Sequence, residues 1–119
     1  MTFYEMDSSR ESRYRMDQAI EFDKRHFNFG FSTPRNGAFK IPKTGWYYVY
    51  VSSSFDTQLR KNGSNLYNLS NYYRGVILAR TQNMLTLQFN AGDTISVHSR
   101  THQNWIAHHV GSIHIRFLF

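Results

Sequence analysis

Short runs of apolar and aromatic residues recur along the chain, each bounded by residues that favour turns. Such runs predict strands, and their near-regular spacing predicts an all-β sandwich or barrel. The expected strands are residues 20–31, 39–41, 46–55, 58–66 (with a turn at 60–63), 72–79, 84–89, 94–100 and 112–119. Asn36-Gly37 is the strongest hairpin signal. The polar residues 1–19 are expected to form an N-terminal arm or edge segment beside a domain of residues 20–119.

The run GWYYVYV, residues 45–51, is apolar on both faces of its strand. A strand with one wet face alternates apolar and polar residues, so this strand needs a cover on its second face as well. Side-chain parity directs one set of residues into the core: Tyr47, Val49 and Val51. The opposite set is Trp46, Tyr48 and Tyr50. Elsewhere, Phe27, Phe29 and Phe31 alternate, and Ile113, Ile115, Phe117 and Phe119 share one face of the last strand.

Composition and charge narrow the class of protein. The 119 residues suffice for one domain, and 17% of them are aromatic, which suits strands and interfaces. The absence of cysteine excludes disulfides and thiolate metal sites. No apolar run reaches the ~20 residues that span a bilayer, and the N-terminus has no apolar signal-peptide region. From Lys24 onward, eleven Lys and Arg face only Asp56 and Asp93, so this part should attract anions.

Four motifs occur in an order that is similar to one known family. They are GAFKIPKTGWYYVYV (37–51), LRKNGS (59–64), MLTLQFNAGDTISVH (84–98) and SIHIRFLF (112–119). Together they resemble the globular domain of complement C1q and its tumour-necrosis-factor relatives over residues 20–119. The sequence departs from the family pattern at Val49, His114 and Arg116. The resemblance implies a two-sheet jelly roll of ten strands that assembles as a homotrimer, with the inner sheets around a threefold axis.

The resemblance also implies which side chains lie between subunits. If the strands 94–100 and 112–119 both line the inner sheet, the trimer interface comprises Trp46, Tyr48, Tyr50, His98, Arg100, His114, Arg116 and Leu118. In the alternative, the chain is a monomer and one of its own loops covers this face. Because a free imidazole gains charge near pH 6.5, we expect assembly to weaken below about pH 6.

Catalysis finds little support in the sequence. The six His fit no metal-ligand or triad spacing, and the sequence contains no GxSxG, P-loop or HExxH motif. Asp93 follows a glycine in a turn, where its carboxylate is expected to satisfy turn backbone. We therefore expect a protein that is not an enzyme and has no cofactor and no metal.

Binding has more candidate residues. Loops at 58–73 and 101–111 are expected to cap the jelly roll, where aromatic and basic side chains could stack on sugars and hold sulfate or carboxylate. The candidates are Arg60, Lys61, Arg74, His102, Trp105, His108 and His109. The alternative is ordinary polar loops that bind nothing. Asn62 and Asn68 begin two candidate glycosylation sequons.

Three functions remain open. The first is a trimeric, lectin-like module that binds glycans or other anionic surface ligands, as in innate pattern recognition. The second is a tumour-necrosis-factor-like ligand for a protein receptor, and the third is a structural tip domain of a viral, phage or spore-surface fibre. The charge would suit nucleic acid, but no nucleic-acid-binding motif accompanies it. We expect a secreted or particle-surface protein that does not insert into membranes.

Overall fold

A computed structural model describes residues 1–6, 17–53, 56–69, 72–73, 76–77, 81–100 and 111–119. These residues form strands and turns, and none of them belongs to a helix that could cross a membrane. The strands are β1 (Thr2–Glu5), β2 (Lys24–Asn28), β3 (Phe39–Lys40), β4 (Gly45–Ser53), β5 (Thr57–Lys61), β6 (Ser64–Asn68), β7 (Tyr72–Tyr73), β8 (Val76–Ile77), β9 (Thr81–Phe89), β10 (Thr94–Ser99) and β11 (Gly111–Phe117).

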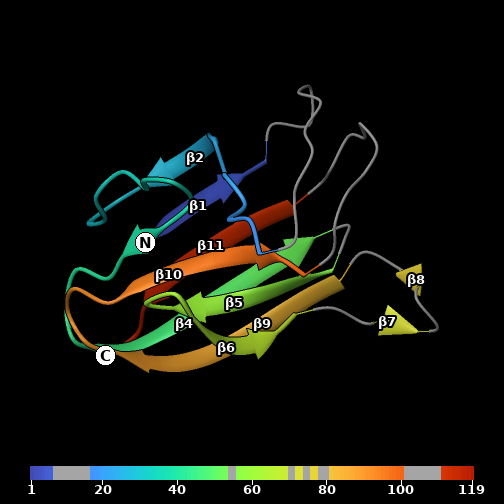
Figure 1. Cartoon of the computed structure of the whole chain (residues 1–119). Helices are drawn as coiled ribbons and strands as arrows, with labels where there is room; N and C mark the ends of the chain where they lie inside the picture. Colours follow the sequence, from blue (N-terminus) through green and yellow to red (C-terminus); the bar gives the residue numbers. More distant parts are fainter. Residues whose placement is uncertain (7–16, 54–55, 70–71, 74–75, 78–80, 101–110) are drawn as a thin grey trace.

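The strands form two antiparallel sheets and a separate small hairpin (Figure 1). The first sheet has the order β2-β1-β11-β4-β9, and the second has the order β3-β10-β5-β6. The hairpin consists of β7 and β8, in which Tyr72 pairs with Ile77. The expected two-sheet jelly roll is therefore confirmed.

The core lies between the two sheets and follows the predicted parity of β4. Tyr47, Val49 and Val51 are at most 1% exposed. Apolar residues of β10, β11 and β3 complete the same cluster, and the fully buried ones are Phe39, Ile95, Val97, Ile113 and Ile115. The hydroxyl of Tyr47 donates a hydrogen bond to the Lys43 carbonyl oxygen at 2.5 Å, so the largest buried ring also has its polar atom satisfied.

The N-terminal segment is part of the sheet. β1 lies between β2 and β11, and Thr2, Tyr4 and Met6 are buried. The sequence predicted an arm or an edge segment here because polar residues dominate the first 19 positions. Burial nevertheless alternates along β1, because Thr2 and Tyr4 face the core while Phe3 and Glu5 are only partly buried.

Three strand predictions need correction. Residues 20–31 do not form one strand, because β2 comprises only Lys24–Asn28. Gly30 has φ +82° just beyond it, and Phe29 is 69% exposed while Phe31 is buried. Residues 72–79 do not form one strand, because β7 and β8 pair with each other in antiparallel orientation. Phe119 does not share the buried face of β11, because it lies beyond the end of the strand and is 75% exposed.

The Asn36-Gly37 hairpin turn is confirmed. Arg35 and Ala38 exchange two backbone hydrogen bonds of 3.1 and 2.9 Å across it, and both central residues have positive φ. A Cβ on Gly37 would lie 2.5 Å from the Ile20 carbonyl oxygen. Glycine is therefore required at this position both by the backbone conformation and by the close approach of a neighbouring segment.

Candidate functional site

The outer face of the five-stranded sheet carries a row of mostly aromatic residues, one from each strand. Strand register aligns Phe27, Phe3, His114, Tyr50 and Met84 across β2, β1, β11, β4 and β9. We call these five residues the aromatic row. Tyr50 and Met84 have the parity opposite to the buried residues of β4, so the row faces away from the core.

Ring contacts join the row into one surface. The Phe3 ring is stacked with the His114 ring at a centroid distance of 5.6 Å, and Phe27 meets the same imidazole edge-on at 5.8 Å. Tyr48 approaches it edge-on at 6.2 Å. His114 therefore lies at the centre of an aromatic cluster built from four strands.

Apolar side chains on and beside the row stay exposed to solvent. Met84 is 68% exposed, and Trp46 is 38% exposed with its ring 6.4 Å from that of Phe119. Leu118, which follows β11, is 39% exposed. Exposed aromatic and apolar residues that gather on one sheet face are typical of an interaction surface.

His114 is the titratable group at the centre of this surface. Its Nε2 is buried and has no hydrogen-bond partner among the described residues. Burial lowers the pKa of His114 below its usual range, and the Arg116 guanidinium and the amino terminus lower this pKa further. On the same face, the Nε2 atom of His26 lies 2.9 Å from the Glu5 carboxylate. The folded protein therefore favours the neutral form of the His114 imidazole.

The expectation that His98 and Arg100 share this surface is wrong. Their segment pairs with β3 and β5 in the four-stranded sheet, whereas β11 pairs with β1 and β4. His98 Nδ1 donates to the Asp17 carbonyl oxygen at 2.8 Å, so Nε2 accepts the Ser96 hydroxyl, also at 2.8 Å. Arg100 lies 3.7 Å from the Asp56 carboxylate.

Both histidines make stability depend on pH in the same direction. Burial is the main cause that lowers the pKa of His98, as it is for His114. A base whose pKa is lower in the folded state keeps its full contribution above the unfolded pKa of about 6.5 and loses it as the pH falls below that value. The lowered pKa of the Asp93 carboxyl acts only in a lower window, below about pH 4.

We therefore expect the wild-type protein to unfold at a lower urea concentration near pH 5 than near pH 7.5. His114→Gln should reduce this difference, because it removes one of the two described histidines whose pKa burial lowers. Urea titrations of both proteins at the two pH values measure the effect. An equal pH difference in wild type and variant would contradict the role of His114.

The basic loop candidates are only partly described. Arg60 donates to Gln58 at 2.6 Å and pairs with Asp17 at 2.7 Å, and Lys61 lies 3.6 Å from the Asp93 carboxylate. Both cations thus belong to strand β5 and are engaged within the chain. The remaining candidates lie outside the described residues: Arg74, His102, Trp105, His108 and His109.

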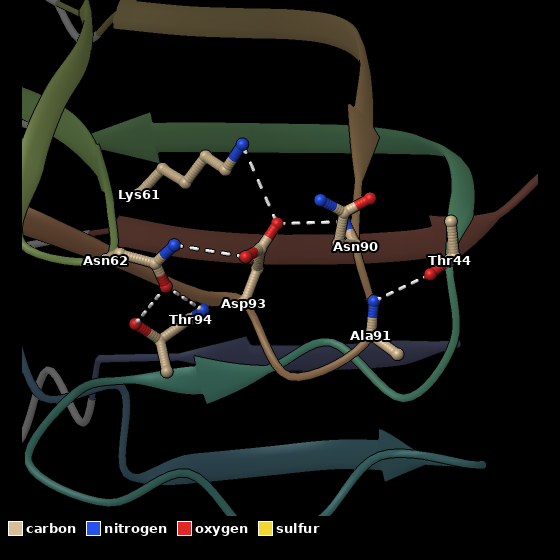
Figure 2. A network of polar contacts seen from close by, with 7 residues as sticks. All are labelled: Thr44, Lys61, Asn62, Asn90, Ala91, Asp93 and Thr94. Carbon is tan, nitrogen blue, oxygen red and sulfur yellow. Dashed lines mark hydrogen bonds and ion pairs between the residues drawn. The ribbon is translucent and has the colours of Figure 1, made fainter.

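Asp93 organises the turns beside β5 and β10, as Figure 2 shows. It accepts the Asn90 backbone N–H at 2.8 Å and the Asn62 amide at 3.0 Å. These two hydrogen bonds, led by that from Asn62, lower the pKa of the Asp93 carboxyl. The expected role of Asp93 in satisfying turn backbone is confirmed. The Asn62 amide oxygen also accepts the Thr94 backbone N–H at 2.9 Å, so the side chain of this candidate glycosylation residue is engaged in hydrogen bonds within the chain. Asn68, the other candidate, is exposed on β6.

Sequence reasoning missed a hollow beside the Asn36-Gly37 turn. Its volume is about 530 Å³, within the range of small-ligand sites. It is lined by Ser32, Thr33, Arg35, Ala38, Lys40 and Thr94, and we call it the basic cleft. The available signal was two basic residues flanking the strongest hairpin turn. No group of three or more potential metal ligands occurs among the described residues.

Comparisons with solved structures place the fold. The globular domain of zebrafish complement 1qA protein matches with a TM-score of 0.69 at 15% identity, over 99% of this chain and 96% of that chain. Eiger TNF from S. frugiperda matches with a TM-score of 0.66 at 15% identity, over 99% and 93% of the two chains. Rabbit GITRL matches with a TM-score of 0.63 at 14% identity, over 100% and 95%.

These likenesses define a C1q/TNF-like jelly roll, which is the fold that the four motifs predicted. No protein-family model and no curated protein matches the sequence.

Proposed function

We propose that the protein is a recognition module that assembles as a homotrimer through the outer face of the five-stranded sheet. The observation that carries this proposal is the aromatic row with its exposed apolar neighbours, Trp46 and Met84. A single subunit leaves these side chains in water, and burying aromatic surface is the main driving force of obligate assembly. The resemblance to C1q and tumour-necrosis-factor domains supports a second and third copy of the chain as the cover.

Assembly through this face leaves the four-stranded sheet and its turns available for ligands. The chain beyond residue 23 carries a formal excess of nine positive charges, which favours anionic partners such as glycans with acidic groups. Sites repeated three times in one assembly would also bind a multivalent surface more tightly than one site does. Such a module would act at an extracellular or particle surface.

A binding comparison at two salt concentrations tests the ligand class. We expect binding to immobilised sulfated glycans to persist at about 0.15 M salt, where the screening length falls to ~8 Å and diffuse charge attraction is weakened. Unsulfated forms of the same glycans and duplex DNA are the controls. Equal binding to every polyanion, lost in parallel as salt rises, would contradict a glycan-recognition function.

A further inference from the structure

The basic cleft lies between the hairpin turn at Asn36-Gly37 and the start of β10. Lys40 of β3 is the register partner of Thr94 in β10, which places these two lining residues side by side. Arg35 enters the cleft from the turn itself. The cleft therefore brings together two cations from different elements of one subunit.

The two cations of the cleft differ from the other basic residues near the four-stranded sheet. Arg60, Lys61 and Arg100 each lie beside a carboxylate. Arg35 and Lys40 are exposed, and neither has an ion-pair partner among the described residues. Their charges are therefore available to an anion from solution.

The hydroxyl groups of the cleft complete a donor set, and the surrounding backbone is held in place. Ser32, Thr33 and Thr94 are the hydroxyl-bearing residues of the lining, and the Thr94 hydroxyl lies 3.4 Å from the Asn62 amide oxygen. The paired hydrogen bonds between Arg35 and Ala38 fix the turn. At the start of β10, the Thr94 backbone N–H donates to the Asn62 amide oxygen, as Figure 2 shows. Binding would therefore require little ordering of the backbone.

We propose that the basic cleft binds the tetrahedral oxyanion of a sulfate ester or a phosphate monoester. A guanidinium can donate two parallel hydrogen bonds to such a group, an ammonium adds a compact charge, and hydroxyls satisfy the remaining oxygens. A neighbouring hollow shares Thr33 but contains Glu21 and Asp23, which repel anions. The ester group is thereby directed to the side of the loop that carries Arg35 and Lys40.

This inference deepens the proposed recognition function, because it names the group that the module would recognise. Every lining residue belongs to one subunit, so the cleft does not need the trimer in order to bind. Ester binding and assembly can therefore fail independently, and the two results can be read from the same protein samples.

The test is a titration of the 119-residue protein with glucose 6-sulfate, glucose 6-phosphate and glucose, in which amide chemical shifts report binding. The ligand concentrations extend to about 20 mM, a range suited to weak binding of a single group. The double variant Arg35→Gln/Lys40→Gln removes both cations. Lys24→Gln/Arg25→Gln removes two exposed charges from β2 and is the matched control. Thermal unfolding checks that both variants fold, and light scattering gives the mass of each sample.

We expect saturable shifts centred on Thr33, Ala38 and Thr94 with one or both esters, and none with glucose. The cleft variant should bind about tenfold more weakly or worse, because two charged donors are lost, while the control variant binds as wild type does. The tighter ester identifies the source of the oxyanion. Absence of saturable binding, or equal weakening in both variants, would overturn the proposal. A trimeric mass without ester binding overturns only the cleft, and ester binding by a monomer overturns only the assembly.

Discussion

Met84→Glu is expected to dissociate the proposed trimer into folded monomers. Met84 closes the aromatic row on β9 beside Tyr50 and is 68% exposed in the single subunit. A carboxylate there costs little in water, because substitutions at exposed sites usually change stability by about 0.5 kcal/mol or less. In the proposed assembly, however, three carboxylates would have to leave water without partners, which is strongly unfavourable.

Leu66→Glu is the matched control for this experiment. Leu66 is also an exposed apolar residue, but it lies on β6 at the edge of the four-stranded sheet. The same change of charge at Leu66 should leave the mass of the assembly unaltered. Light scattering on a sizing column measures both variants. A Met84→Glu protein that keeps the mass of the wild type would contradict assembly through the aromatic row.

Tyr47→Ala is expected to lower the free energy of unfolding of the single subunit by about 3–5 kcal/mol, the usual range for truncating a buried aromatic ring. Tyr47 has no exposed surface, and its ring contacts those of Phe31, Phe89 and Phe117. Its removal would leave a cavity between the sheets that surrounding strands cannot fill by small shifts.

Tyr47→Phe separates packing from hydrogen bonding at the same position. It keeps the ring and loses only the bond from the hydroxyl to the Lys43 carbonyl, so a loss of about 0.5–1.5 kcal/mol is expected. Urea denaturation should be measured in the Met84→Glu background, because unfolding of an assembled protein depends on its concentration. A similar decrease in the free energy of unfolding for Tyr47→Ala and Tyr47→Phe would contradict the proposed contribution of ring packing to stability.

The sequence was sufficient to assign the two faces of β4. The strand period of two separates Tyr47 from Tyr48, and the buried and outer sets of the structure follow this division. Likewise, Asn36-Gly37 predicted its turn, because both residues adopt positive φ with little strain. Local rules of this kind predict faces and turns well wherever the pattern is strong.

Sheet membership could not be predicted in the same way. Periodicity shows that His98 and His114 each lie on the face of their strand opposite to its apolar residues. It does not show which strands lie beside each of these strands in the sheets. His98 belongs to the four-stranded sheet and His114 to the five-stranded sheet, so the two residues cannot share one surface. This arrangement depends on hydrogen bonding between strands that are distant in the sequence.

The binding candidates show the same limit. Arg60 suggested an anion site because it lies in a basic stretch, but its partner Asp17 is 43 residues away in the sequence. Arg35 and Lys40 flank the Asn36-Gly37 turn, but the sequence alone does not mark them as a site, since their importance comes from a hollow formed jointly with β10. Charge that is free for a ligand is therefore defined by tertiary contacts, whereas total charge is visible in the sequence.

The most direct test of the proposed assembly is the solution mass of the wild-type protein at about pH 7.5, which lies above the ordinary pKa of a free imidazole. Light scattering on a sizing column is expected to give three times the subunit mass of 14.1 kDa. A mass of 14.1 kDa at every concentration tested would contradict the trimer and would leave the aromatic row as the surface of a monomer.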